Sequence, residues 1–312
     1  MFLDRFDYKI DFMGKRHISM AISTLLIIVA VSSLATKGLV FGIDFTGGTL
    51  VEVGYTQDAD LEKIRANLHD NGFSDAVVQN FGSTKDVLIR LGVHEETKDD
   101  PLSSQILRLL QSDGTEVEMR RVEFVGPQIG EELVEQGGLA VIYTLFGILI
   151  YVGFRFEYRF ALGSIAALIH DTLIVVGVFS VLELEFDLTI LAAVLAVIGY
   201  SLNDTIVVFD RIRENFVKLR KQDSISVMNI SINQMLGRTV MTSVTTALVL
   251  VVLFVKGGEL IHGFATALLI GVIVGTYSSI YIASAAALAL GVSKNDLMPV
   301  QKEGIDQKST NY

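Results

Sequence analysis

Six apolar stretches constrain the fold of this chain more than any other feature of its sequence. They occupy residues 18–36, 139–154, 160–182, 188–209, 239–255 and 263–290, and the only acidic or basic side chains in them, histidine aside, are Asp171 and Asp204. An α-helix needs about 20 apolar residues to cross a bilayer. The composition agrees, because 51% of the residues are hydrophobic and the mean hydropathy is +0.51. The sequence therefore predicts an α-helical membrane protein with six transmembrane helices.

The first apolar stretch has a second interpretation, as the core of a cleaved signal peptide. Residues 33–35 are Ser-Leu-Ala, which resembles the small-x-small pattern of a cleavage site. Such cores usually have about 7–15 residues, however, and this stretch has 19. We therefore expect residues 18–36 to remain in the membrane as the first helix.

Residues 37–136 have the periodicity of a small α+β domain. Alternating apolar residues predict strands, and apolar residues three or four apart predict helices. In chain order the predicted elements are strand 49–55, helix 59–69, strands 75–81 and 86–91, helix 102–110 and strand 116–125. This β-α-β-β-α-β order is that of the ferredoxin-like arrangement. We expect such a domain between the first and second membrane helices.

Lysine and arginine residues precede the first apolar stretch and follow each even-numbered one. They are Arg5, Lys9, Lys15, Arg16, Arg155, Arg159, Arg211, Arg213, Lys218, Arg220, Lys221, Lys294, Lys302 and Lys308. Cytoplasmic loops of membrane proteins carry such an excess of positive charge. This pattern predicts that the N-terminus (1–17), an amphipathic loop (210–238) and the C-terminal tail (291–312) are cytoplasmic, and that the ferredoxin-like domain is periplasmic.

Charge and residue usage exclude several classes of function. Residues 37–136 hold 19 Asp and Glu against 9 Lys and Arg, which accounts for the whole net charge of −10 and argues against a nucleic-acid partner. The chain has no cysteine, which excludes disulfides, thiolate nucleophiles and cysteine metal sites. It also lacks the Gly-x-x-x-x-Gly-Lys-Ser/Thr pattern of a phosphate-binding loop. We expect no cofactor, and any energy supply has to come from an ion gradient.

Asp204 is the residue most in need of a functional explanation. It follows Asn203 inside the fourth apolar stretch, and the basic cluster begins only at Arg211. A carboxylate in the membrane costs about 2.5–3.5 kcal/mol on insertion scales, so it marks a functional site by default. Arg238 opens the fifth stretch near the same membrane face, where the two charges can meet at similar depth. The alternatives are a structural ion pair or an arginine that reaches the headgroups.

Other polar side chains in the apolar stretches have weaker functional interpretations. Thr242 and Thr246 follow Arg238 at four-residue steps and form one polar face of the fifth helix, which Ser243 and Thr245 widen. This face either lines a hydrated ion path or packs helices together. Asp171, after His170 in the third stretch, either supports the ion path or makes a packing hydrogen bond.

Several glycines have structural interpretations. Gly271 and Gly275 form a small-xxx-small face that favours close helix packing. Gly42, Gly47 and Gly48 surround Asp44 and predict a turn at the start of the outer domain.

Several of these segments resemble the SecF family of protein translocase subunits. They are residues 41–48 (FGIDFTGG), 125–130 (VGPQIG), 170–171 (HD), 199–205 (GYSLNDT), 209–216 (FDRIRENF), 238–239 (RT), and 271 with 278–281 (SSIY). The likeness extends over nearly the whole chain and is weakest in the helices of the outer domain and in the tail.

The resemblance implies a subunit of the bacterial inner membrane. Such subunits pair with SecD, associate with the SecYEG channel and use the proton-motive force to complete the export of unfolded polypeptides. The family belongs to the resistance-nodulation-division superfamily, whose members contain two six-helix repeats. Since this chain holds one repeat, we expect a partner half. The family's proton-relay carboxylate and arginine correspond to Asp204 and Arg238, and some relatives couple to Na⁺ instead of H⁺.

Two other functions are compatible with parts of the sequence. An intramembrane aspartyl protease would use Asp171 and Asp204 as a carboxyl pair. However, Asp204 follows Leu-Asn and not a Gly-x-Gly turn, and Arg238 would have no role. The half of an efflux or lipid exporter of the same superfamily would need a second repeat and a larger outer domain. We expect an ion-coupled export subunit and not an enzyme.

Overall fold

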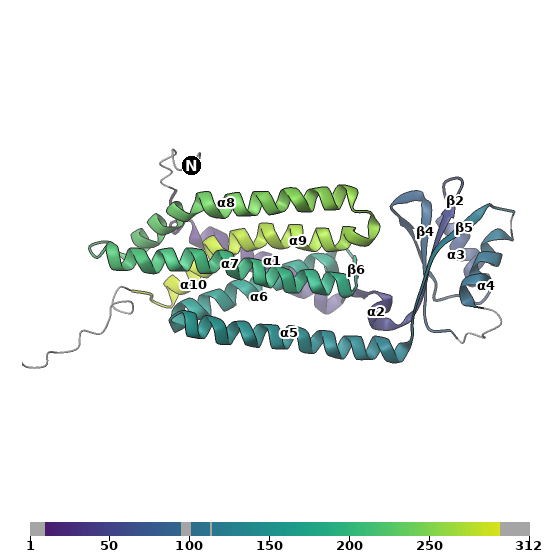
Figure 1. Ribbon diagram of the computed structural model, residues 1–312, viewed down its shortest axis with the longest axis horizontal. Helices are drawn as coiled ribbons and strands as arrows, with labels where there is room; N and C mark the ends of the chain where they lie inside the picture. The colour runs from purple at the N-terminus through teal and green to yellow at the C-terminus, as the bar shows by residue number, and fades with distance from the viewer. Residues whose placement is uncertain (1–9, 95–100, 113, 294–312) are drawn as a thin grey trace, which may run out of the picture.

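The computed structural model describes residues 10–94, 101–112 and 114–293. The molecule is elongated, with a helical bundle at one end and a small domain containing a sheet at the other (Figure 1). The expectations for residues 1–9 and 294–312 lie outside the described residues.

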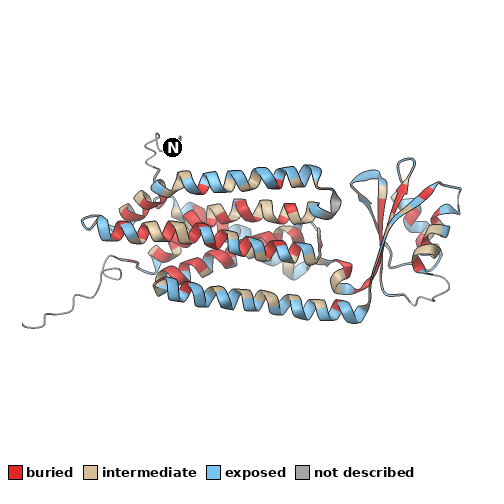
Figure 2. Cartoon of the chain, viewed as in Figure 1, coloured by how far each residue is buried: buried red, intermediate tan, exposed pale blue. Residues whose placement is uncertain are grey.

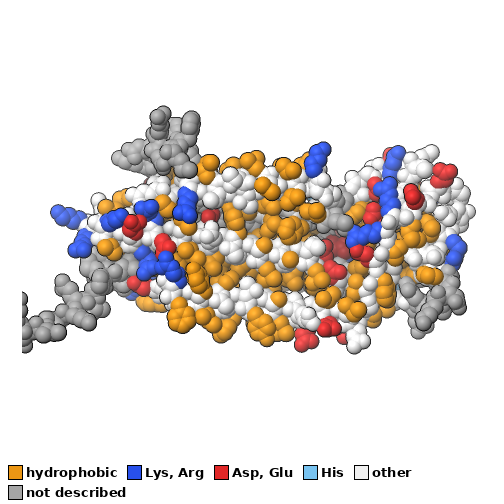
Figure 3. All heavy atoms as spheres, in the orientation of Figure 1, with side chains coloured by type: hydrophobic (Ala, Val, Ile, Leu, Met, Phe, Trp, Pro, Cys, Tyr) orange, Lys and Arg blue, Asp and Glu red, His pale blue; other side chains and the backbone are white. Residues whose placement is uncertain are grey.

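Within the described residues, six helices are long and apolar enough to cross a membrane, which confirms the predicted class of fold. They are α1 (Arg16–Thr36), α5 (Pro127–Arg155), α6 (Tyr158–Val181), α7 (Leu188–Lys218), α8 (Ser224–Lys256) and a last helix built from three parts. The parts of the last helix are α9 (Glu259–Ser278), a π-helical turn (Ser279–Ala283) and α10 (Ser284–Ala289). Apolar side chains cover the middle of the bundle, and Lys and Arg gather at the end far from the sheet (Figure 3).

Three helices form the centre of the bundle and three lie outside. About half of the central helices α6, α7 and α9 is buried, whereas α1, α5 and α8 expose most of their surface (Figure 2). Gly271 and Gly275 allow α9 to approach α7 closely. A Cβ atom at Gly271 would lie 2.0 Å from a methyl group of Val197, and one at Gly275 would lie 3.1 Å from Ser201 Cβ. The predicted packing role of these two glycines is therefore confirmed.

Two helices extend beyond the apolar stretches, and the expected loop 210–238 is helical except at residues 219–223. The reason is that a buried face continues at helical spacing after the charges begin: Ile212 and Phe216 on α7, and Met228 and Ile232 on α8, are almost fully buried. Helix α5 likewise begins at Pro127, twelve residues before the predicted span, because proline suits the first turn of a helix.

The first described residues are held against α8 by two asparagine side chains. Asn233 accepts a hydrogen bond from Ile10 N (3.0 Å) and donates one to Ile10 O (2.8 Å). One turn earlier on α8, Asn229 accepts from Met13 N at 2.9 Å. Because Phe12 and Met13 are buried, this segment is part of the bundle.

The small domain has the predicted ferredoxin-like topology. Its elements are β2 (Gly48–Tyr55), α3 (Leu61–Asp70), β3 (Val77–Phe81), β4 (Ser83–Leu91), α4 (Leu102–Gln111) and β5 (Val117–Val125). The strands form an antiparallel sheet in the order β3-β4-β2-β5. Alternate strand residues such as Val51, Val53 and Ile89 pack against Leu68 of α3 and Ile106 of α4 to form a separate core.

A compact joint connects the domain to the bundle. Strand β1 (Val40–Phe41) leaves α1 and pairs in parallel with β6 (Glu185–Phe186), which lies between α6 and α7. The short helix α2 (Ile43–Thr46) follows and packs on α5. Asp44 on α2 accepts a hydrogen bond from Leu188 N, the first residue of α7, at 3.1 Å. The joint thus contacts three membrane helices and the sheet.

Gly47 and Gly48 are needed in this joint for conformation and for space. Both have positive φ, +68° and +127°. A Cβ atom at Gly48 would lie 2.2 Å from the carbonyl oxygen of Leu91, and one at Gly47 would lie 2.9 Å from Pro127 Cα. The glycines around Asp44 therefore form more than the turn that the sequence predicts.

We expect Gly48→Ala to lower the free energy of unfolding by more than about 1–3 kcal/mol, because strained φ and steric overlap add. Thermal unfolding in detergent checks this. Gly126→Ala is the control, since a Cβ atom there meets nothing within 4 Å and φ is −65°. Equal melting temperatures for the two variants would contradict the prediction.

Candidate functional site

Asp204 lies in α7 with only 4% of its surface exposed. Its Oδ2 atom has no hydrogen-bond partner among the described residues. Buried carboxylates are normally paired or hydrogen-bonded, because removing an ion from water costs several kcal/mol. A buried carboxylate oxygen without such a partner is a group able to accept a proton or a cation.

Arg238, on α8, lies at the same level as Asp204. Tyr200 Oη donates to Ser243 Oγ at 3.4 Å, which fixes how the antiparallel helices α7 and α8 face each other. Four residues further along α7 is Asp204, and four residues back along α8 is Thr239, the neighbour of Arg238. No ion pair within 4.0 Å joins its guanidinium to the Asp204 carboxylate in the part of the chain that the structure describes. Arg238 is exposed on this chain.

Asp171 occupies a different environment, fully buried and fully bonded. Its Oδ1 lies 2.8 Å from His170 Nδ1. Its Oδ2 accepts hydrogen bonds from Ser201 Oγ on α7 (2.5 Å) and Ser278 Oγ on α9 (2.7 Å). The carboxyl group of Asp171 therefore ties the three central helices together.

Further polar contacts extend from Asp171 in two directions. Toward α1, the His170 ring lies 6.2 Å from that of Tyr277, whose hydroxyl donates to Ser19 O at 2.7 Å. Toward the end of the bundle far from the sheet, Thr205 on α7 and Ser279 at the π-helical turn share a hydrogen bond of 3.0 Å. These serines and Tyr277 were not predicted as site residues, although their polar side chains within apolar stretches are a signal for them.

Among the described residues, no hydrogen bond joins Asp204 to the other predicted supporting residues. Asn203 is exposed on α7. Thr242 and Thr246 each donate to a backbone carbonyl of α8, at 2.8 and 2.9 Å. Ser243 bonds Thr239 O at 2.9 Å and also lies 2.6 Å from Thr276 Oγ1 on α9. The functional roles of Asn203, Thr242 and Thr246 stay predictions.

The joint contains a further charge, the half-buried Glu185. Arg90 on β4 donates to Phe41 O at 2.6 Å and lies 3.7 Å from Glu185 Oε1, so it connects the sheet to the loop before α7. Burial raises the pKa of the Glu185 carboxyl, Arg90 opposes this rise, and the Asp187 and Asp44 carboxylates add to it.

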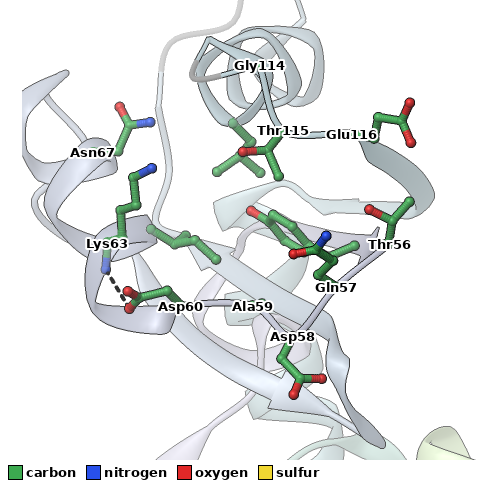
Figure 4. A pocket seen from close by; sticks show the side chains of 13 residues that line it. Thr56, Gln57, Asp58, Ala59, Asp60, Lys63, Asn67, Gly114, Thr115 and Glu116 are labelled. Carbon is green, nitrogen blue, oxygen red and sulfur yellow. Dashed lines mark hydrogen bonds between the residues drawn. The ribbon is translucent and has the colours of Figure 1, made fainter.

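The small domain has a pocket of about 540 Å³ between its β2–α3 and α4–β5 connections (Figure 4). Two of its carboxylates have structural partners. Asp60 accepts from Lys63 N at 3.1 Å and caps α3, and Asp58 accepts from Thr84 Oγ1 at 2.6 Å. The pocket is remote from the buried charges of the bundle, and it is not the candidate site.

We expect Ser278→Ala to cost about 1–2 kcal/mol of stability, because it removes one donor from a buried carboxylate. Ser164→Ala is the matched control, since the Ser164 hydroxyl is equally buried but bonds only to Phe160 O of its own helix, at 3.1 Å. Unfolding of both variants in detergent measures the difference. Equal losses would show that the bond to Asp171 has no special weight.

The raised pKa of Glu185 predicts a pH dependence. The folded state holds the Glu185 proton above the pH at which the unfolded chain releases it, so stability falls as pH rises from the ordinary glutamate pKa through the raised one. Glu185→Gln should remove this loss, measured as melting temperature against pH. Glu183→Gln is a control of opposite sign, because a hydrogen bond from Lys37 lowers the pKa of Glu183. An unchanged pH profile for Glu185→Gln would refute the assignment.

Comparisons with known proteins cover almost the whole chain. The family model for the C-terminal part of the protein export membrane proteins SecD and SecF matches residues 105–293, and the model of the SecD/SecF GG motif matches residues 32–59. Protein translocase subunit SecF from Vibrio alginolyticus is 54% identical, over 95% of this chain and 95% of its own. The subunit from Pseudomonas aeruginosa is 51% identical, over 96% of this chain and 97% of its own.

A solved structure has the same fold. The crystal structure of SecDF from Thermus thermophilus, a translocon-associated membrane protein, matches 91% of this chain with a TM-score of 0.83 and 40% identity. A super-membrane-facing form of SecDF matches with a TM-score of 0.69. This chain spans only 39% of the length of either SecDF chain.

Proposed function

Because the chain belongs to the SecF family of protein translocase subunits, we propose that it couples ion flow across the bacterial inner membrane to protein export. Its driving force is the proton-motive force, or a Na⁺ gradient, and its substrate is an unfolded exported polypeptide. The potential supplies about 2.3 kcal/mol per elementary charge per 100 mV. It acts as a transport subunit and not as an enzyme.

The observation that carries this proposal is the buried Asp204 carboxylate without a hydrogen-bond partner on Oδ2. In one state the carboxylate is ionised and Arg238 balances its charge across the α7–α8 interface. In the other state a proton or cation neutralises it, and Arg238 is released. Because the two states differ in charge, each favours a different packing of α7 against α8.

Helix α7 provides a mechanical route from Asp204 to the outer domain. It runs without interruption from Asp204 to its first residue, Leu188, about 24 Å away at 1.5 Å per residue. Leu188 N bonds Asp44 in the joint, and Arg90 connects the same joint to the sheet. A shift or rotation of α7 therefore acts on the joint. The small domain would then move against an emerging polypeptide.

The proposal includes a SecD-like partner and the SecYEG channel. The outer helices α5 and α8 expose broad apolar surfaces. The related SecDF chain is more than twice as long as the matched region, which leaves room for a second half. Binding sites between two repeats of a transporter need both repeats. Arg238 is exposed on α8, so a partner packed there would complete its surroundings.

The proposed orientation puts both termini in the cytoplasm and the small domain in the periplasm. The basic residues at the end of the bundle far from the sheet support it (Figure 3). The protease alternative is not favoured, because Asp171 bonds His170, Ser201 and Ser278 and shares no hydrogen bond with Asp204 among the described residues. The exporter alternative is not favoured either, since the relatives compared above are protein translocase subunits.

The proposal predicts that Asp204→Asn abolishes gradient-stimulated export. The amide keeps the shape of the carboxyl group but can no longer change its charge. Translocation is measured in inverted vesicles that contain the chain with its partner subunit and channel, with and without an ion gradient. Stimulation by the gradient should fall to the level without a gradient, while gradient-independent translocation remains.

Arg238→Lys tests the pairing geometry in the same assay. Lysine keeps the charge but loses the planar fork, so we expect reduced coupling. Full gradient stimulation in Asp204→Asn would refute the relay. Full stimulation in Arg238→Lys would show that Arg238 acts only as a charge near the headgroups.

A further inference from the structure

Two buried oxygen atoms without hydrogen-bond partners lie on the facing helices α7 and α8. They are Oδ2 of Asp204 and Oγ1 of Thr239, whose side chains are 4% and 1% exposed. Nearly all buried polar atoms in proteins bond to protein, ordered water or an ion. Two such atoms in one interface point to a shared ligand.

The helix register places the two oxygens opposite each other. Tyr200 on α7 bonds Ser243 on α8. Residues four apart lie on the same helix face, one turn away. Because α7 and α8 are antiparallel, the step from Tyr200 to Asp204 and the step from Ser243 to Thr239 lead to the same level of the interface. The electrostatic influence of Arg238, the neighbour of Thr239, on Asp204 agrees with this placement.

Thr239 differs from the other hydroxyl residues of its helix. Thr242, Ser243, Thr245 and Thr246 each donate to a carbonyl of α8 one turn earlier, which is the usual way for a helix to satisfy a hydroxyl. Thr239 makes no such bond, although it is more deeply buried than any of them. Its hydroxyl is therefore available to a ligand.

We propose that Asp204 and Thr239 together bind one small monovalent cation, a hydrated proton or Na⁺. The carboxylate supplies the negative charge, and the threonine hydroxyl supplies a second oxygen that fixes the position of the cation. Oxygen ligands suit both species. This inference rests on the proposed function, because it identifies where the driving ion binds.

The charges around this position favour a single cation. Arg238 competes for the Asp204 carboxylate from α8. On α6, His170 Nδ1 bonds Asp171, and Asp171 bonds Ser201 and Ser278, whereas His170 Nε2 is buried without a hydrogen-bond partner among the described residues. Toward the last helix, Thr205 and Ser279 bond each other. A cation that enters between Asp204 and Thr239 thus neutralises the carboxylate in place of Arg238. Binding of the cation is therefore linked to the change from the ionised to the neutralised state of Asp204.

The test compares three variants in vesicles that contain the complete translocation complex. Thr239→Val keeps the shape and removes the hydroxyl, Thr239→Ser keeps the hydroxyl, and Thr245→Val removes an exposed hydroxyl bonded to Met241 O. One series applies a pH gradient without Na⁺, and the other applies a Na⁺ gradient at equal pH. The series in which the wild-type complex responds identifies the cation.

In that series, Thr239→Val should raise the ion concentration for half-maximal stimulation about tenfold, as expected when one bond to a charged ligand is lost. Thr239→Ser should stay within about twofold of wild type, and Thr245→Val should be unchanged. Co-purification with the partner subunit verifies assembly. If Thr239→Val does not assemble, Thr239→Ala replaces it.

An unchanged ion dependence in the Thr239 variant would overturn this inference, provided that Asp204→Asn has lost stimulation. In that case the proposed function stands and the cation binds without Thr239. Retained stimulation in Asp204→Asn would instead refute the proposed function, whatever the Thr239 variants do. Equal shifts in Thr239→Val and Thr245→Val would also overturn the inference, because the effect would not be specific to the buried hydroxyl.

Discussion

The hydrogen bonds of the Asp171 carboxyl group hold the centre of the membrane bundle in one arrangement. A buried carboxylate is stable only when donors surround it. Here the donors Ser201 and Ser278 come from two other helices. They reach the carboxylate because Gly275 lets α9 approach α7 at Ser201. The close approach of the helices and the hydrogen bonds to Asp171 therefore depend on each other. Replacing Gly275, Ser201 or Ser278 weakens both.

The two membrane carboxylates have opposite relations to their surroundings. Ser201, which bonds Asp171, lies three residues before Asp204, so α7 is anchored at Ser201 and carries an unbonded carboxylate oxygen about one turn further along. The anchor gives α7 a fixed axis in the bundle. Under the function proposed above, a change of charge at Asp204 would act on this anchored helix, whose first residue, Leu188, is bonded to Asp44 of the joint.

Much of this fold could be predicted from the sequence, because each element has a local signal. The strands and helices of the outer domain follow from their periodicity, and Asp204 stands out by its cost in lipid. The ends of α7 and α8 could not be placed, since a charged surface masks the buried face of Ile212, Phe216 and Met228. The roles of Ser201, Ser278 and Thr239 depend on which helices touch. The joint at Gly47 and Gly48 requires contacts between distant segments.

The parallel pairing of β1 with β6 has a consequence for how the protein is made. Val40 pairs with Glu185, so the two partners are separated by 145 positions of the chain, from 40 to 185. The outer domain is complete at Val125 and has its own core, whereas its seat on the bundle requires α6 to have been synthesised and inserted first. The core of the outer domain can therefore form from residues 48–125 alone, whereas its connection to the bundle is incomplete until Phe186 has been synthesised. The pairing of β1 with β6 is thus a late step of assembly, because it joins a strand before the outer domain to a strand that follows α6.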